Sequence, residues 1–334
     1  MNIAFCDVNQ YERKAIEAWT NDPTLREMSI SLSEKPIEDL KDYDFDVISI
    51  FIDSKVTKDL LDKFTKLKLI LTRSAGIDHI DLNECKNRGI IVCNVPDYGS
   101  ETVAEFTLFL ILSLTRKIKK IEKYYEGGTS IEDLRGNCLG GKVIGIMGAG
   151  RIGTNVARLA KAFGMKILFF NRSQNKEMTE LGGEKVDLDE LLANSDVISL
   201  HLPLTDATRR IINESNIDRL KASSLLINTA RGQLLDTGAL IAALKKGAIG
   251  GAALDVIEGE EFTNKELEII THTEDYEKLK EILENSLLKK YDNVILTPHI
   301  AYNTTEALQK LISTTLDNVD NFVSGKPLNN TILG

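Results

Sequence analysis

The sequence lacks the features that mark secreted, membrane and nucleic-acid-binding proteins. Its four cysteines, Cys6, Cys85, Cys93 and Cys138, show no metal-ligand spacing, and scattered thiols favour a reducing cytoplasm over a disulfide framework. No basic segment followed by a long apolar stretch opens the chain, so no signal peptide is expected. The longest apolar run, 103–114, is interrupted by polar residues and is shorter than the roughly 20 residues that a membrane span requires.

Basic residues are also fewer than acidic ones. The 41 Lys and Arg residues are outnumbered by 50 Asp and Glu, and the net charge of -9 argues against nucleic acids and anionic membranes as partners. The 43% of hydrophobic residues is typical of a soluble globular protein, and 334 residues favour two domains.

Two stretches of alternating strand-like and helix-like segments predict two parallel sheets of the α/β class, each a doubly wound, Rossmann-like domain. Strands of the first are expected at Ile3–Cys6, Ser29–Leu32, Val47–Ile52, Leu69–Thr72 and Ile90–Cys93. Strands of the second are expected at Val143–Met147, Lys166–Phe170, Val197–Leu200, Leu225–Asn228, Gly251–Leu254 and Val294–Leu296.

Four helical predictions concern the parts between and after these strands. One long helix is expected from an N-cap at Ser100 to about Lys123, and a shorter one near Asn213–Leu220. The segment 258–290 is acidic and then helical, with Leu279, Ile282, Leu283 and Leu287 on one side. A last helix is expected at about 304–323.

A glycine motif, G-x-G-x-x-G, stands between the strand Val143–Met147 and a helical repeat of apolar residues. Gly148 permits a tight turn, Gly150 lets the backbone approach a pyrophosphate, and Gly153 lets the helix pack close to the sheet. Strand, turn and helix in this order indicate a dinucleotide site.

The ribose position argues for NADP. A NAD site usually carries an acidic residue at the end of the next strand, but here that strand is followed by Asn171, Arg172 and Ser173. An arginine fork can hold a 2′-phosphate, so NADP is preferred. Binding of NAD with a solvent-facing Arg172, or use of both cofactors, remains open.

Polar residues that follow the strands of the second sheet suggest the chemistry, because ligands collect at the carboxyl ends of strands. Arg231, Asp255 and His299 follow three of these strands, and Glu258, Glu260 and Glu261 come shortly after Asp255. Arginine can bind a carboxylate in bidentate fashion, and a histidine oriented by a carboxylate can transfer a proton near neutral pH. Together with a dinucleotide, these groups suit hydride transfer.

The chain resembles the D-isomer-specific 2-hydroxyacid dehydrogenases. The resemblance spans the chain and is carried by RSAGIDHIDL (73–82), NVPDYGSETVAEFTL (94–108), the glycine motif, HLPLTDATRRII (201–212), NTARGQLLDT (228–237), GGAALDVIEGEE (250–261) and TPHIAYNT (297–304). The TRS-x-G and LDVxEGEE runs and the arginine and serine at the ribose position are similar to the D-lactate dehydrogenases of vancomycin-resistance operons.

The resemblance implies a role for each matching residue. Arg231 would bind substrate, His299 would be the acid/base and Glu260 its partner. Further substrate contacts would come from Ala75, Gly76, Tyr98 and Tyr302. Besides the glycines and the ribose residues, cofactor contacts would come from Arg151, Ile152, Leu202, Pro203, Thr208, Thr229, Ala230 and Asp255. No proline follows the glutamates, and 39 residues separate Glu260 from His299, so Glu258 or Glu261 could be the partner instead.

The implied layout places a cofactor domain, 101–298, between two parts of a substrate domain, 1–100 and 299–334, with the active site in the cleft between the domains. The implied reaction is reduction of a 2-keto acid to the D-2-hydroxy acid, with pyruvate as the favoured substrate. The enzyme is expected to be a cytoplasmic homodimer without a metal. Two alternatives stay open. One is reduction of glyoxylate or hydroxypyruvate; the other is a non-catalytic corepressor that senses NAD(H).

Overall fold

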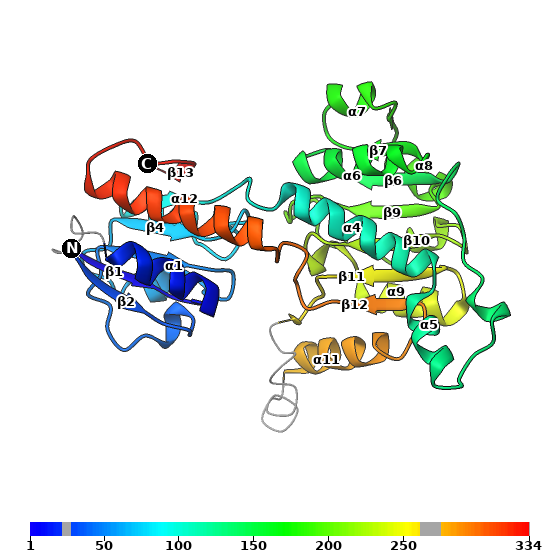
Figure 1. Cartoon of the computed structure of the whole chain (residues 1–334), viewed down its shortest axis with the longest axis horizontal. Helices are drawn as coiled ribbons and strands as arrows, with labels where there is room; N and C mark the ends of the chain where they lie inside the picture. The colour runs from blue at the N-terminus through cyan, green and yellow to red at the C-terminus, as the bar shows by residue number, and fades with distance from the viewer. Residues whose placement is uncertain (22–27, 261–274, 334) are drawn as a thin grey trace. The chain divides into compact units, whose positions relative to one another are not determined.

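The computed structural model describes residues 1–21, 28–260 and 275–333, which divide into two compact units (Figure 1). Unit 1 contains both ends of the chain, Met1–Gly99 and Asn303–Gly334, and unit 2 is the middle, Ser100–Tyr302. Within the described ranges, no helix is both long enough and apolar enough to cross a membrane.

The sheet of unit 1 has six strands in the order β13-β5-β4-β3-β1-β2. Its strands are β1 (Asn2–Phe5), β2 (Ser29–Leu32), β3 (Val47–Ile50), β4 (Leu69–Thr72), β5 (Ile91–Cys93) and β13 (Thr331–Leu333). Strands β1 to β5 are parallel, whereas β13 runs antiparallel along β5. The central strands β3 and β4 are buried at every position, as their apolar sequences require.

Helices cover both faces of this sheet, as in a doubly wound fold. On one face lie α1 (Gln10–Thr20) and α12 (Thr305–Val323), which pack against each other and share a core cluster with β1. The Trp19 indole N–H donates to the Asp320 carboxylate at 3.2 Å and ties the two helices together. The opposite face carries α2 (Lys58–Leu61) and α3 (Leu82–Asn87).

Unit 2 has a seven-stranded parallel sheet in the order β12-β11-β10-β9-β6-β7-β8. Its strands are β6 (Val143–Met147), β7 (Lys166–Phe170), β8 (Glu184–Lys185), β9 (Val197–Leu200), β10 (Leu225–Asn228), β11 (Gly251–Leu254) and β12 (Val294–Leu296). One face is covered by α4 (Ser100–Thr115) and α6 (Arg151–Ala162). The other is covered by α8 (Leu188–Asn194), α9 (Thr237–Lys246) and α11 (Tyr276–Leu288). The short helix α7 (Lys176–Glu180) connects β7 to β8.

Two helical predictions were wrong. The single helix expected from Ser100 to Lys123 is broken, because Lys117 adopts a left-handed conformation with φ 56°, and α5 (Ile118–Tyr125) begins after it. Ser100 is also the first residue of α4 rather than its cap. Between Asn213 and Leu220 the structure has only one 3-10 turn, Ile217–Arg219.

The apolar stripe expected in 258–290 was also wrong. In α11 the buried residues are Ile282, Asn285 and Leu288, whereas Leu283 and Leu287 are 61% and 45% exposed. The helix therefore packs with a face that includes a buried polar residue, which apolar periodicity alone could not indicate.

Candidate active site

The register of the sheet in unit 2 aligns the carboxyl ends of its strands. Met147, the last residue of β6, pairs with Phe170 and with Leu200. The series continues through Asn228, Leu254 and Leu296, which end the next three strands. Because the paired strands end together, the residues that follow them form one row along this edge of the sheet.

The glycine turn follows β6 in this row and has the shape that binding of a pyrophosphate requires. Gly148 has φ 105°, and a Cβ there would lie 2.5 Å from the carbonyl oxygen of His201. A Cβ at Gly153 would lie 2.0 Å from the Gly148 carbonyl oxygen, whereas one at Gly150 would meet no atom within 4 Å. Helix α6 starts at Arg151 without a side-chain cap, so its first N–H groups can bind an anion. The turn fits a dinucleotide.

The residues after β7 lie beside this turn. The Asn171 carboxamide accepts from the Ala149 N–H at 3.4 Å and donates to the Ser173 carbonyl at 3.1 Å. Arg172 and Ser173 are exposed, and the Lys185 ammonium donates to the Arg172 carbonyl at 3.3 Å. The guanidinium of Arg172 and the ammonium of Lys185 are therefore two cations beside the end of β7, and Asn171, Arg172 and Ser173 contribute no carboxylate there.

After β9 the chain turns close to Gly148. The His201 imidazole lies 2.8 Å from the Ser199 hydroxyl, and burial lowers the pKa of His201 to about 3, so the ring is neutral. Leu202 is buried, and the Thr208 hydroxyl donates to the Pro203 carbonyl at 2.6 Å, which closes the loop that carries the predicted cofactor contacts.

The loop after β10 is shaped by a buried asparagine. Asn228 donates to the Arg231 carbonyl at 2.8 Å and accepts from the Ala230 N–H at 3.1 Å. The Thr229 hydroxyl lies 3.0 Å from that of Thr107 on α4, which fixes the loop from the helical side. Arg231 is extended and half-buried, and its guanidinium donates to the Ala230 carbonyl at 2.7 Å.

His299 and Glu260 come together at the same edge. The imidazole Nδ1 lies 3.0 Å from Glu260 Oε1, and Glu260 Oε2 accepts from the Ile257 N–H at 3.4 Å. Burial lowers the pKa of His299, but the hydrogen bond and charge of Glu260 outweigh it and raise the pKa above its usual value. The charge of Arg231 also acts on this imidazole, opposing protonation. The Tyr302 ring packs edge-on to the imidazole, with ring centroids 6.3 Å apart.

Asp255 holds the segment that carries His299. Its buried carboxylate accepts from the Thr297 hydroxyl at 2.6 Å and from the N–H groups of Ile300 and Ala301, both at 2.9 Å. These three bonds support His299 in a left-handed conformation, φ 53°, that is unfavourable for a residue with a side chain.

Comparison with known proteins assigns the chain to a family. The profile of the "D-isomer specific 2-hydroxyacid dehydrogenase, NAD binding domain" matches residues 108–301. A "2-hydroxyacid dehydrogenase A" of Aspergillus oryzae is 35% identical, over 100% of this chain and 95% of its own. The chain belongs to the D-isomer-specific 2-hydroxyacid dehydrogenases. It is thus an oxidoreductase with an NAD-binding domain, and it acts on 2-hydroxy and 2-keto acids.

Two further relatives bear on the substrate and the fold. A "Glyoxylate reductase" of Thermofilum pendens is 40% identical over 80% of this chain and 75% of its own. The crystal structure of a D-lactate dehydrogenase from Aquifex aeolicus, complexed with NAD and lactic acid, superposes with a TM-score of 0.89 at 38% identity, covering 100% of this chain and 99% of that one. The fold prediction of two parallel-sheet α/β domains is confirmed.

In this dehydrogenase Glu258, another candidate partner of His299, is placed differently from Glu260. Glu258 is buried and lies 3.4 Å from the Arg210 guanidinium, and its carbonyl accepts from the Asn285 amide at 2.9 Å. Glu261 lies outside the described residues. Burial raises the pKa of Glu258, and the charge of Arg210 opposes that rise.

Several residues that shape this dehydrogenase's site were not predicted from the sequence. A Cβ at Gly232 would lie 2.2 Å from the Ile257 carbonyl carbon, so only glycine lets the loops of Arg231 and Glu260 meet so closely. Asn228, Arg210 and Asn285 were likewise not predicted. A glycine directly after Arg231 was the one available signal.

The remaining predicted substrate residues belong to unit 1. The N–H groups of Ala75 and Gly76 donate to no protein atom within the described part of the chain. Their loop is shaped by the Ser74 hydroxyl, which donates to the Gly76 carbonyl at 2.6 Å, and by the Asn94 amide, which donates to the Ala75 carbonyl at 2.8 Å. Tyr98 is half-buried. The substrate roles of these residues, and a cleft between the units, stay predictions.

Proposed function

We propose that the dehydrogenase reduces pyruvate to D-lactate, with Arg231, Glu260 and His299 as its catalytic residues. The observation that carries the proposal is the 3.0 Å contact between His299 Nδ1 and Glu260, at the sheet edge where the glycine turn and the Arg231 loop also lie.

His299, Glu260 and Arg231 would each have a separate role in the reaction. Bound NAD(P)H supplies a hydride to the carbonyl carbon of the substrate. Because Glu260 engages Nδ1 of His299, the other ring nitrogen, Nε2, is the atom that would donate a proton to the carbonyl oxygen. Because its pKa is raised, His299 keeps its proton to a higher pH than an ordinary histidine does. Arg231 binds the substrate carboxylate through two parallel N–H bonds and stabilises the negative charge that develops on the carbonyl oxygen.

A panel of 2-keto acids tests the substrate. We expect the highest kcat/KM with pyruvate, as the D-lactate dehydrogenase from Aquifex aeolicus suggests, and lower values with glyoxylate, hydroxypyruvate and longer 2-keto acids. Preference for glyoxylate would instead favour a glyoxylate reductase, the alternative function that the Thermofilum pendens relative supports. Absence of turnover with every acid would favour the non-catalytic corepressor.

We further propose that the cofactor site accepts NADPH in preference to NADH. Arg172 and Ser173 follow β7, and the Lys185 ammonium lies against the Arg172 carbonyl, so a 2′-phosphate bound here would meet two cations and a hydroxyl. Arg172→Gln should lower kcat/KM for NADPH by about tenfold and leave that for NADH unchanged. A wild-type enzyme that strongly prefers NADH would overturn this proposal.

We also propose a homodimer formed through unit 2. Around α5 the surface exposes large apolar side chains that a water-facing helix would not need: Tyr125 is 87% exposed, Ile131 67% and Ile118 38%. Sedimentation should show a dimer in the wild type and a monomer in Tyr125→Asp/Ile131→Asp. A monomeric wild type would contradict the proposal.

We place the enzyme in the cytoplasm, as its thiols suggest. All four cysteines are free, and Cys6, Cys85 and Cys93 are buried. Fractionation of cells with an antibody against the protein tests this location, and recovery of the protein outside the cytoplasm would contradict it.

A further inference from the structure

The loop that follows β4 in unit 1 presents backbone N–H groups without a protein partner. Among the described residues, the N–H groups of Ala75, Gly76 and Ile77 donate to no protein atom. Two carbonyls of the same stretch are bound by side chains: the Asn94 amide donates to the Ala75 carbonyl at 2.8 Å, and the Ser74 hydroxyl to the Gly76 carbonyl at 2.6 Å. Because the carbonyl and the N–H of a planar trans peptide point in opposite directions, these bonds turn the N–H groups of Gly76 and Ile77 away from the two side chains.

The same two bonds fix Gly76 from both sides. The peptide before Gly76 is held by Asn94, and the peptide after it is held by Ser74. Glycine has the greatest backbone freedom of all residues, so an unanchored glycine here would have to be ordered whenever a ligand binds to the loop. Anchoring both peptides orders the N–H groups in advance, which raises affinity for a ligand without adding a contact to it.

The Ser74 hydroxyl is the last side chain of a relay of hydrogen bonds. It lies 2.7 Å from the Thr72 hydroxyl, which in turn lies 3.0 Å from His79 Nε2. Thr72 is the last residue of β4 and is 1% exposed, and Ser74 is 2% exposed. Hydroxyls buried to this degree depend on partners within the protein, so a change at one member of the relay affects the next.

Only one direction of hydrogen bonding fits this relay. A carbonyl can only accept, so the single hydroxyl proton of Ser74 goes to Gly76, and Ser74 must accept from Thr72. The single hydroxyl proton of Thr72 is then used, and Thr72 must accept from His79. Nε2 of His79 therefore carries a proton, whether the ring is neutral or charged.

We propose that Thr72, Ser74 and His79 are positioning residues for substrate binding. Their relay holds the peptide after Gly76, so that the N–H groups of the loop stay oriented to bind the carboxylate of a 2-keto acid. The inference rests on the proposed function and on the predicted substrate contacts of Ala75 and Gly76. The relay acts on the binding of the carboxylate and not on the transfer of hydride or proton, so its loss should raise KM and leave kcat nearly unchanged.

Titration of oxamate, an isostere of pyruvate that is not reduced, tests the inference without turnover. The full-length enzyme is saturated with reduced cofactor, and the fluorescence of the cofactor reports binding. Ser74→Ala and Thr72→Val should each raise the Kd of oxamate about tenfold, because a loosened loop binds the carboxylate less well. His79→Leu should have a similar effect, whereas His79→Gln, whose amide N–H can replace that of Nε2, should bind oxamate as the wild type does. In steady-state reduction of pyruvate, Ser74→Ala, Thr72→Val and His79→Leu should raise KM and not lower kcat.

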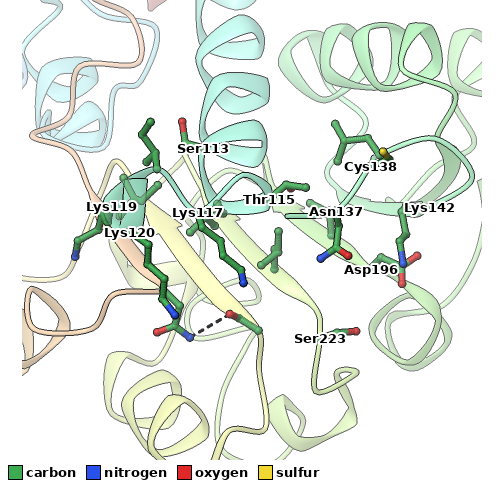
Figure 2. Close-up of a pocket in the computed structure, with 18 of the residues that line it drawn as sticks. Ser113, Thr115, Lys117, Lys119, Lys120, Asn137, Cys138, Lys142, Asp196 and Ser223 are labelled. Atoms are coloured by element: carbon green, nitrogen blue, oxygen red, sulfur yellow. Dashed lines mark hydrogen bonds between the residues drawn. The ribbon is translucent and has the colours of Figure 1, made fainter. Parts of the chain in front are cut away.

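A buried hydroxyl in unit 2 provides the matched control. Thr115, which Figure 2 shows at the end of α4, is 7% exposed, and its hydroxyl donates to the Ile111 carbonyl at 2.7 Å. Thr115→Val removes a buried hydroxyl just as Thr72→Val does, and it should leave the Kd of oxamate unchanged. The comparison separates the orientation of the loop from a general loss of stability.

The proton on His79 gives a second test that needs neither activity nor a stable variant of the relay. NMR of the imidazole nitrogens of the wild type should show a protonated Nε2 in His79, one of four histidines, whose signals are assigned by their loss in His79→Gln. An unprotonated Nε2, an unchanged Kd of oxamate in Ser74→Ala and Thr72→Val, or an equal rise in Thr115→Val would overturn the inference. If the wild type still reduced pyruvate, the proposed function would stand without it.

Discussion

At the scale of single residues, the protonation of His299 depends on its neighbours. Burial disfavours the imidazolium, and Glu260 and Asp255 together more than compensate, so the pKa is raised. A base with a raised pKa carries its proton below that pKa and loses it as the pH rises through it. Reduction of a 2-keto acid needs the protonated form and should therefore fall on the alkaline side.

Glu260→Gln should shift this alkaline limb to lower pH. The substitution removes the negative charge and the strong acceptor, leaving burial to lower the pKa of His299. The pH dependence of kcat/KM for pyruvate reduction measures the midpoint directly. Glu214→Gln, at an exposed glutamate, serves as control. If both variants kept the wild-type midpoint, Glu260 would not be the partner that sets the protonation of His299.

Arg231→Lys should reduce kcat/KM by roughly a hundredfold or more, because an ammonium cannot reproduce two parallel N–H bonds to a carboxylate. Steady-state kinetics with pyruvate gives the effect, and Arg209→Lys, at an exposed arginine, is the matched control. Near-normal activity in Arg231→Lys would remove this residue from the site.

At the scale of elements, loops after neighbouring strands are held together by backbone contact. The loop after β10 touches the loop after β11 at Gly232, where a side chain would collide with the Ile257 backbone. Helix α11 supports the second loop through Asn285, whose amide donates to the Glu258 carbonyl at 2.9 Å. Helix α11 thus contributes to the position of the loop that carries Glu260.

Gly232→Ala should lower kcat by about tenfold or more, because the new Cβ forces apart the loops that carry Arg231 and Glu260, and small displacements of catalytic groups are costly. Cofactor affinity, measured by fluorescence titration, should change little. Gly140→Ala places its Cβ 3.8 Å from the nearest atom and should be neutral. Equal kinetics for the two variants would show that the close packing at Gly232 does not matter for the chemistry.

At the scale of the whole molecule, the sequence predicted the elements defined by local patterns. Eleven of the strands follow from apolar runs between turn residues, and all six that were predicted in unit 2 have the predicted bounds. The break at Lys117 was missed because a left-handed residue inside a helical pattern has no local signal. The strands β8 and β13 are two and three residues long and become strands only by pairing with β7 and β5.

The candidate site likewise contains residues that a local sequence pattern predicts and residues that only contacts within the fold define. Arg231 and His299 were predicted because each follows a strand and matches a family motif. Gly232, Asn228 and Asn285 act through contacts with residues distant in the sequence or through loop geometry, which no local pattern encodes. Whether Glu258 or Glu260 faces His299 depended on the path of one loop, and the structure places Glu260 beside the imidazole.

The most direct test compares wild type and His299→Gln in pyruvate reduction, with the lactate formed resolved into its enantiomers. The wild type should form D-lactate. The variant should be slower by roughly a hundredfold or more, yet bind reduced cofactor with unchanged affinity. L-lactate from the wild type, or near-normal turnover by the variant, would contradict the account of how this dehydrogenase works.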